Sequence, residues 1–325
     1  PKKPSTPSPP LLFCSKQNPP PNTRWEKDTG MAVKETIEAK QQIATPPLTG
    51  TELREKIRLF PWWIVGLMGV FVLTAHLVLT RSSYQEAFNF IRAGIGVTIQ
   101  TTLIAYGFAL ILGLFTGLGR ISHNVIIQNL GTLYVELIRG IPMLVLIFFI
   151  AFVGVPAGVG LLNRIGEWLL QIGLVTLAEP LIRLENSAVP MTTRAIIALS
   201  VTYGAFQAEI FRAGIQSIGR GQMEAARAQG MTYWQAMRFI ILPQAIRNVL
   251  PALGNDFVSM LKDSSLVSVL AVRDITQIAK LYAGRSFQYQ EAYVTLAVLY
   301  LSMTVVLSAL VKGLERRIRQ DERNA

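Results

Sequence analysis

Residues 224–243 read EAARAQGMTYWQAMRFIILP, and this stretch indicates a helix, a tight turn and a second helix. Two helix-periodic pieces flank Gly230, and the spacing of Thr232 and Gln235 is that of a capping box. Pro243 is expected to end the second helix. Ala225 and Ala226 leave one helix surface without bulk, so another backbone is able to approach it. The stretch therefore predicts an exposed helical element that docks a partner.

The composition places this element in a membrane protein. The chain has 325 residues, of which 51% are hydrophobic and 16% charged, with a mean hydropathy of +0.39. These values are too apolar for an ordinary soluble domain. Six windows have about the 20 residues that cross hydrocarbon: 60–80, 94–119, 130–155, 194–211, 250–272 and 292–311. The sequence predicts an all-α membrane protein, and the spacing of Gly113 and Gly117 predicts close packing of the second span.

The distribution of charge sets the expected topology. The formal net charge is +11, and basic residues concentrate in the N-terminal tail, in 212–247 and in 312–323. Because Lys and Arg mark the cytoplasmic side, both termini and the 219–243 loop are placed in the cytoplasm. Five basic residues fall on the other side: Arg164, Arg183, Arg194, Lys280 and Arg285.

Outside the central spans, three segments are assigned by composition. Residues 1–58 are Pro-rich and predict a disordered cytoplasmic tail, residues 59–81 an N-terminal span retained as an anchor, and residues 320–325 a short cytoplasmic tail. Residues 154–191 are expected outside, lying on the surface, because Glu167, Glu179, Pro180 and Arg183 argue against a seventh span.

Several chemistries are excluded at once. The chain has one cysteine, Cys14, and two histidines, His76 and His123, so we predict no intrachain disulfide and no metal-ligand cluster. No Gly-x-x-x-x-Gly-Lys-Ser/Thr loop occurs. Any ATP and Mg²⁺ chemistry is therefore expected on a partner, and no cofactor on this chain.

The stretch fills a longer pattern, Glu-Ala-Ala, three residues, Gly, nine residues, Ile-x-Leu-Pro, which resembles the signature loop of permease subunits of bacterial ATP-binding cassette (ABC) importers. The residues that fill it are Glu224, Ala225, Ala226, Gly230, Ile240, Leu242 and Pro243. The flanking segments YVELIRGIP at 134–142 and LPQAIRNVLPALGNDFVSMLKDSSL at 242–266 resemble the polar amino acid uptake branch.

This resemblance implies a type I importer fold over residues 94–319, with a five-helix core and the first span as an addition. It implies that the chain is no enzyme but a multi-pass subunit of the bacterial cytoplasmic (inner) membrane. A second permease would complete the translocation pathway, an extracytoplasmic binding protein would deliver an amino acid, and a dimer of ATPase subunits would supply the energy. The 219–243 loop would be the coupling element, with six coupling residues: Glu224, Ala225, Ala226, Gly230, Leu242 and Pro243.

Polar residues in the inner spans are the candidates for substrate contact, because ionisable groups in spans tend to mark pathways or pairs. Glu209 and Arg212, three apart, either line the pathway or form an internal salt bridge. The other candidates are Asn255, Asp256, Ser259, Lys262 and Asp263. Lys262 and Asp263 are adjacent and point in different directions, so they line the pathway or pair with the second permease.

Ile141 and Leu146 stand where many members of the family have Thr and Gln. This departure favours a heterodimer, whose sister permease carries more of the pocket, over a homodimer. Two alternatives remain at this stage. A stand-alone secondary transporter or channel driven by ion gradients explains the spans but not the small-residue loop, and a membrane sensor docked to an ATPase leaves the polar residues idle.

Overall fold

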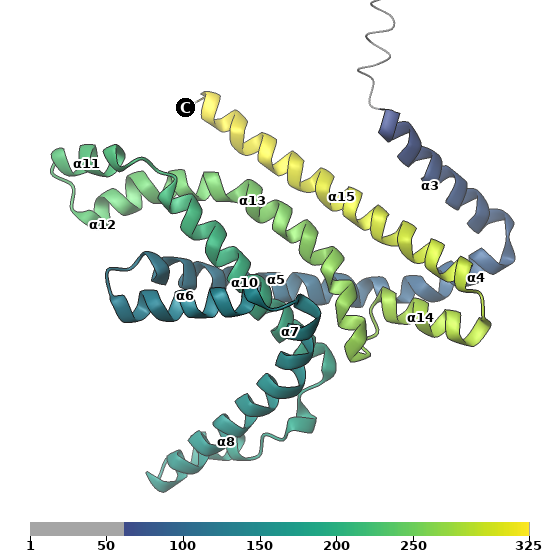
Figure 1. Ribbon diagram of the computed structural model, residues 1–325, viewed down its shortest axis with the longest axis horizontal. Coiled ribbons are helices and arrows are strands. Elements are labelled where there is room, and N and C mark those ends of the chain that lie inside the picture. The colour runs from purple at the N-terminus through teal and green to yellow at the C-terminus, as the bar shows by residue number, and fades with distance from the viewer. Residues whose placement is uncertain (1–61, 325) are drawn as a thin grey trace, which may run out of the picture. The chain divides into compact units, whose positions relative to one another are not determined.

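The computed structural model describes residues 62–324, and every regular element in that range is a helix (Figure 1). Side chains are described for 62 and for 65–317. The predicted tail, 1–58, lies outside the described residues. A helix, α3 (Trp62–Thr80), occupies most of the first predicted span. Within the described range, three helices are long and apolar enough to cross a membrane: Ser82–Ile121, Met143–Gln171 and Tyr289–Arg317.

The central pair of helices is α5 (Ile95–Ile121) and α10 (Met191–Gln216), which pack on each other more extensively than any other two elements. A Cβ added to Gly113 would lie 2.7 Å from Cβ of Gln207, and one added to Gly117 would lie 2.8 Å from the carbonyl oxygen of Ala208. The absence of these Cβ atoms lets the two backbones approach. The close packing predicted from the Gly-x-x-x-Gly spacing is confirmed.

Other helices surround this pair. α6 (Val125–Gly140) folds back along α5 after Asn124, whose side-chain oxygen accepts from the amides of Ile126 and Ile127. α13 (Leu242–Asp263) packs on α10, and α15 (Tyr289–Asn324) packs on α13. α10 and α13 have 26 and 22 residues, long enough to span, but they carry more polar residues than the three apolar helices.

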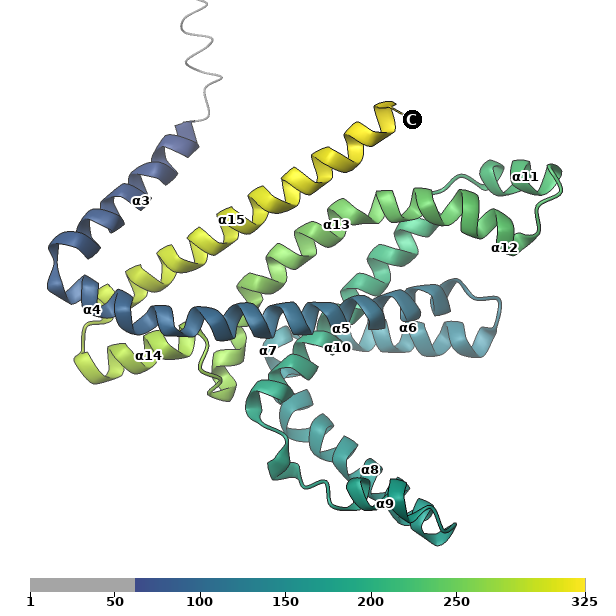
Figure 2. The same cartoon turned by 180° about the vertical axis from the view of Figure 1, so that it is seen from behind.

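The expected third span, 130–155, is interrupted in the structure. α6 ends at Gly140 and a new helix starts after Pro142. That helix runs without a break through α7 (Met143–Phe149), a π-turn (Ile150–Gly154, η2) and α8 (Val155–Gln171). The segment expected outside therefore begins inside a continuous helix. It continues with α9 (Val175–Ile182) and the 3-10 turn η3 (Asn186–Ala188), and Figure 2 shows α8 and α9 projecting from α7.

Arg194 connects the segment from η2 to η3 with the start of α10. Its buried guanidinium donates to the carbonyl oxygens of Ala151 at 2.9 Å, Val189 at 3.0 Å and Asn186 at 2.6 Å, and to Oδ1 of Asn186 at 2.7 Å. A buried charge needs such partners because its desolvation is costly. The side chain thereby joins the π-turn, the loop before α10 and α10 itself.

The expectation that Pro243 ends a helix is wrong. α12 (Tyr233–Ala236) continues through a second π-turn (Met237–Ile241, η4) into α13. Proline has no amide hydrogen and clashes with the carbonyl four residues earlier. In the wider turn the amide of Leu242 donates to the carbonyl of Met237, five residues back, which leaves room for the ring. The other π-turn has the same relation to Pro156, since each proline follows its π-turn by two residues.

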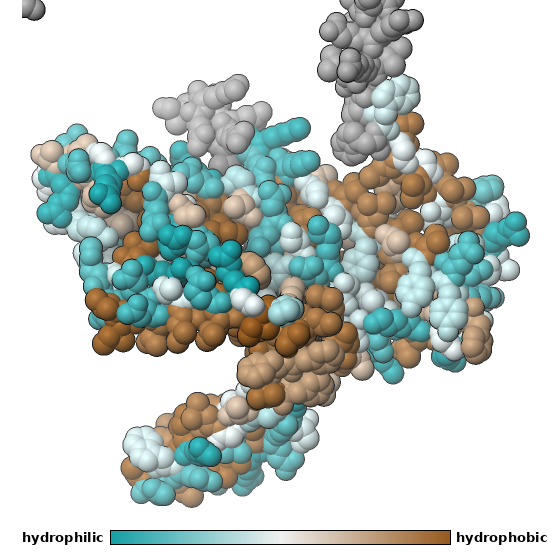
Figure 3. All heavy atoms as spheres, viewed as in Figure 1, coloured by the Kyte–Doolittle hydropathy of each residue, from teal (hydrophilic) through white to brown (hydrophobic). Residues whose placement is uncertain are grey.

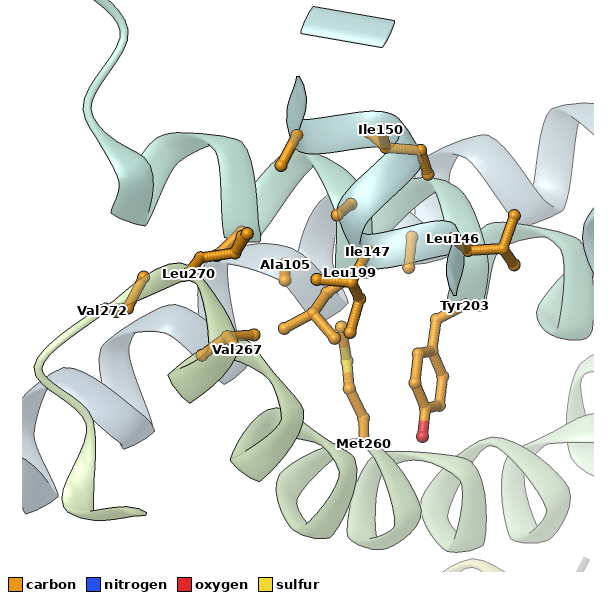
Figure 4. Close-up of a cluster of buried hydrophobic side chains, with 14 residues drawn as sticks. Ala105, Leu146, Ile147, Ile150, Leu199, Tyr203, Met260, Val267, Leu270 and Val272 are labelled. Carbon is orange, nitrogen blue, oxygen red and sulfur yellow. The ribbon is translucent and has the colours of Figure 1, made fainter. Parts of the chain in front are cut away.

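The expected fifth span, 250–272, also ends early. α13 stops at Asp263 and the chain tightens into the 3-10 segment η5 (Ser264–Leu270), followed by Ala271 at a φ of 57°. Val267 and Leu270 are buried against Leu199 and Met260 in the main hydrophobic cluster (Figure 4). These apolar residues therefore pack against protein.

The two ends of the bundle differ. α14 (Ile275–Ser286) and α4 (Ser82–Ile91), which is joined to α5 by η1 (Arg92–Gly94), pack on each other and on α15. In both ribbon views they lie at the end of α5 opposite to α11 (Arg220–Ala228) and α12 (Figures 1 and 2). The 219–243 loop and the turn between α5 and α6 share the other end.

Candidate functional site

The 219–243 loop has the helix–turn–helix form that the sequence predicts. α11 ends in two nested hydrogen bonds. The amide of Met231 donates to the carbonyl oxygen of Ala226 at 3.2 Å, and the amide of Gly230 donates to the carbonyl oxygen of Arg227 at 3.0 Å. This is the Schellman arrangement, which requires a left-handed residue after the helix. Gly230 supplies it with a φ of +84°. The predicted bend at Gly230 is confirmed.

The start of the second helix is fixed by the predicted capping box. The hydroxyl of Thr232 accepts from the amide of Gln235 at 3.3 Å, and the side chain of Gln235 accepts from the amide of Thr232 at 2.8 Å. With the turn bounded on both sides by local hydrogen bonds, α11 and α12 are held in one relative direction.

The faces of the loop are divided between the bundle and solvent. Ala226 is buried, and α11 packs on η4, where Ile241 is buried and Met237 is half-buried. Glu224 and Ala225 are exposed. Leu242 is half-buried and Pro243 exposed. The structure therefore presents Glu224 and Ala225 outward and uses Ala226 and Gly230 to hold the loop.

Two exposed aromatic side chains on the same loop were missed by the sequence reasoning. Trp234 is 77% exposed and Phe239 63% exposed. Exposed large aromatics are typical of protein contacts. Glu224 is also the only carboxylate between 210 and 255, a stretch that carries several arginines. The loop thus offers apolar area and one acidic group in basic surroundings.

A charge cluster lies near this end of α10. Glu209 forms an ion pair with Arg212, as the spacing of three predicts, and accepts from Nη1 of Arg120 on α5 at 2.5 Å. Arg120 also approaches Glu136 of α6 at 3.9 Å. Arg120 was not found from the sequence because it is 89 residues from Glu209. The cluster joins α5, α6 and α10.

Beside this cluster is a cavity of about 710 Å³ between α10, α13 and α15. Glu209, Asn248 and Glu315 are among its lining residues. Apolar side chains, among them Ile210 and Leu250, line much of the rest of it, so the cavity has the mixed lining of a small-molecule site. Of the two interpretations of Glu209, the salt bridge is present, and the cavity leaves a pathway role open to test.

Further along α13, two carboxylates meet α10. Oδ2 of Asp263 accepts from the hydroxyl of Tyr203 at 2.7 Å, and Oδ2 of Asp256 accepts from Nε2 of Gln207 at 3.1 Å. Tyr203 and Gln207 are buried, one helical turn apart. Figure 4 shows the ring of Tyr203 extending from α10 with its hydroxyl directed toward α13. These partners were also missed, because the pairing is made across helices.

The remaining candidates are less enclosed. Asn255 and Lys262 are exposed and Ser259 is half-buried. Lys262 and Asp263 point in different directions, as expected for neighbours on a helix. Leu146, noted for replacing a polar residue of the family, is buried in the hydrophobic cluster of Figure 4.

Apolar helices that end in an exposed helix–turn–helix define a membrane protein with a docking element, and comparisons with known proteins give its class. Residues 109–320 match the family described as "Binding-protein-dependent transport system inner membrane component". A probable glutamine ABC transporter permease protein of Bacillus subtilis (strain 168), GlnM, is 38% identical over 72% of this chain and 96% of its own. The nopaline transport system permease protein NocM of Agrobacterium fabrum is 33% identical over 70% of this chain and 86% of its own.

Solved structures agree. A chain in the crystal structure of an amino acid ABC transporter with histidines is 36% identical, covers 74% of this chain and 97% of its own length, and has a TM-score of 0.59. A chain of the MetNI methionine ABC transporter, 21% identical over 71% of this chain and 95% of its own, has a TM-score of 0.51 and shows the fold alone.

The chain belongs to the binding-protein-dependent ABC transporter permeases, in the branch for polar amino acids. It is an inner-membrane, multi-pass component of an ABC amino-acid importer, a transporter subunit and not an enzyme. Such a system includes ATPase and binding-protein partners. This membership sets aside the alternative of a stand-alone secondary transporter.

Proposed function

We propose that this chain forms the translocation pathway together with a second permease, and that its 219–243 loop seats in an ATPase subunit and transmits the closure of the ATPase dimer. ATP and Mg²⁺ would be bound by those subunits. A binding protein delivers the amino acid from outside, ATP-driven closure turns the pathway outward, and hydrolysis returns it inward.

The observation that supports this proposal most directly is the rigid structure of the 219–243 loop. Its two helices are fixed to each other by the Schellman turn and the capping box, and to the bundle through η4 and α13. A push on α11 is therefore transmitted to α13, whose Asp256 and Asp263 contact α10. Rigid connection between a docking surface and a membrane helix is what mechanical coupling requires.

The proposed topology has six spans: α3 as the additional N-terminal helix, and a five-helix core made of α5, the pair α6–α7, α10, α13 and α15. The permease domain is proposed over 94–319, with the extracytoplasmic insert at 154–191 and both termini in the cytoplasm. Lys262, Asp263, Asp256, Asn255 and Ser259 are proposed to line the pathway or face the second permease, with Glu209 and Arg212 at its inner end. A heterodimer, whose sister permease supplies polar contacts, is proposed from the departures at Ile141 and Leu146.

Two measurements test this proposal. The tagged chain, extracted gently from its native membrane, is expected to bring with it an ATPase subunit and a second permease, and the eluate is expected to hydrolyse ATP. Isolation of this chain alone, active on an ion gradient after reconstitution, would contradict the proposal.

The second measurement is Glu224→Lys, which reverses the charge of the exposed acidic group. The variant is expected to insert and assemble normally. It is expected to transport less amino acid per ATP hydrolysed than the parent protein. Gln222→Lys is the matched control, since Gln222 is exposed in the same helix but lies nearer the face of Ala226 that packs on the bundle. Normal uptake in Glu224→Lys would refute the coupling role of this residue.

A further inference from the structure

The α8–α9 hairpin has no part in the coupling loop or the polar pairs, yet it has a packed interior. A Cβ on Gly166 would lie 2.8 Å from Cγ1 of Ile182 and 3.1 Å from the carbonyl of Ala178, so the two helices are in close contact. Gly173, at a φ of +83°, makes the turn between them. The main contacts of α8 are with α9, η2 and η3, and the hairpin stands away from the bundle (Figure 2).

Three stripes divide the surface of α8, each with the spacing of one helix face. Gly166 faces α9 and is buried, and Val159, about two turns earlier on the same side of α8, is also buried. One residue further along, Arg164, Glu167 and Gln171 form a polar exposed stripe. One residue further again lies an apolar exposed stripe: Leu161 is 59% exposed, Ile165 40% and Trp168 59%. The polar and apolar stripes are about 100° apart around the helix.

The apolar stripe is continued by neighbouring elements. Leu174, Val175 and Leu177 at the hairpin tip are exposed, and so are Phe149 and Phe152 at its root. Figure 3 shows hydrophobic surface along α7 continuing onto the hairpin, where it lies beside hydrophilic surface. Because α7 belongs to a helix long and apolar enough to cross a membrane, this surface is continuous with one that such a helix would present to lipid.

The proposed topology locates the hairpin. If α6 and α7 together make one span, the continuous helix Met143–Gln171 leaves the hydrocarbon core after α7, and α8 begins where the core ends. The end that carries Arg164, Glu167 and Gln171 is the end that leaves the core. An amphipathic helix with a tryptophan on its apolar side is stable where hydrocarbon meets water. Solvent on all sides would leave the apolar stripe in water.

We propose that the α8–α9 hairpin is a lipid-binding element that rests in the membrane interface, with Leu161, Ile165 and Trp168 in the acyl region and Arg164, Glu167 and Gln171 toward the headgroups and water. The occupant of the apolar stripe is lipid. The hairpin thereby extends the footprint of the subunit on the membrane, and Arg194 connects it to α10.

The test uses the fact that Cys14 is the only cysteine of the chain. In a Cys14→Ser background, single cysteines are placed at Leu161, Ile165, Arg164 and Glu167, spin-labelled, and studied in the whole complex reconstituted in liposomes. Collision rates with oxygen, which concentrates in lipid, and with a water-soluble nickel chelate are then compared. Phe115→Cys, on an exposed position of α5, and His123→Cys, in the exposed turn after it, give the lipid and water references.

Labels at 161 and 165 are expected to favour oxygen, and labels at 164 and 167 to favour the nickel chelate. If all four favour nickel, the hairpin stands in water and the proposal is wrong. If 161 and 165 are shielded from both reagents, the stripe is covered by protein, which also overturns it. Amino-acid uptake by the same liposomes reports the proposed transport function separately, so failure of one is distinguishable from failure of the other.

Discussion

Replacing Gly230 by alanine isolates the backbone conformation of the turn between α11 and α12. Gly230 has a φ of +84°, and nothing lies within 4 Å of an added Cβ. The methyl group therefore meets no neighbour, and the cost arises from the left-handed backbone alone, about 1–2 kcal/mol. That energy corresponds to an about five- to thirtyfold lower ratio of the native turn to its open forms.

Hydrogen–deuterium exchange measures this ratio directly. The amides of Gly230 and Met231 donate to Arg227 and Ala226 only while the turn is formed. In Gly230→Ala these two amides, including that of the new alanine, are expected to exchange about five to thirty times faster. Uptake per ATP is expected to fall in the same variant, because α11 is no longer held against η4. Gly230→Asn is expected to lie between the two, since asparagine tolerates the left-handed region.

The matched control is Gly221→Ala in α11 itself. Gly221 also has nothing within 4 Å of an added Cβ, but its φ is not positive. Alanine is a better helix former than glycine by about 1 kcal/mol, so exchange is expected to stay equal or slow down. Equal exchange of the turn amides in Gly230→Ala and the parent protein would refute the assignment of Gly230 as the residue that holds the loop.

Three further perturbations test the bundle. Arg194→Met removes four hydrogen bonds from a buried site and is expected to lower the stability of the complex by about 3–5 kcal/mol. The assay is the temperature at which monodisperse complex is lost on heating. A variant as heat-stable as the parent would contradict the role of Arg194 in joining η2 to α10. Gly113→Ala forces a 2.7 Å contact and is expected to cost about 1–3 kcal/mol in the same assay, whereas Gly107→Ala, with open space around it, is expected to cost nothing. Tyr203→Phe removes the donor to Asp263, and uptake is expected to fall while assembly is retained; unchanged uptake would exclude a role for this pair in transport.

Local signals predicted the loop well and the spans less well. The capping box at Thr232, the turn at Gly230 and the ion pair of Glu209 with Arg212 depend on residues at most five apart, and all are present. Hydropathy windows failed at 141–142 because an average over a window does not register the helix break before Pro142. They failed after Asp263 because hydropathy does not separate burial in lipid from burial in protein. Leu270 is apolar for the second reason.

The sequence did not predict the side-chain contacts between different helices. Arg120, Tyr203 and Gln207 bind acidic residues 89, 60 and 49 positions away, and no periodicity marks such pairs. The passage of a helix through Pro243 was also missed, because it depends on a wider turn that the proline itself requires.

The two π-turns have a consequence for how this chain tolerates insertions and deletions. Each holds one residue more than an ordinary α-helical turn. Deleting one residue within Met237–Ile241 would convert the π-turn into an α-helical turn and leave α12 in nearly the same orientation relative to α13, but Pro243 would lose the wider turn that leaves room for its ring. The same deletion inside α5 has no spare residue to remove, so it would rotate one part of that helix by about 100° relative to the other and displace Gly113 and Gly117 from α10.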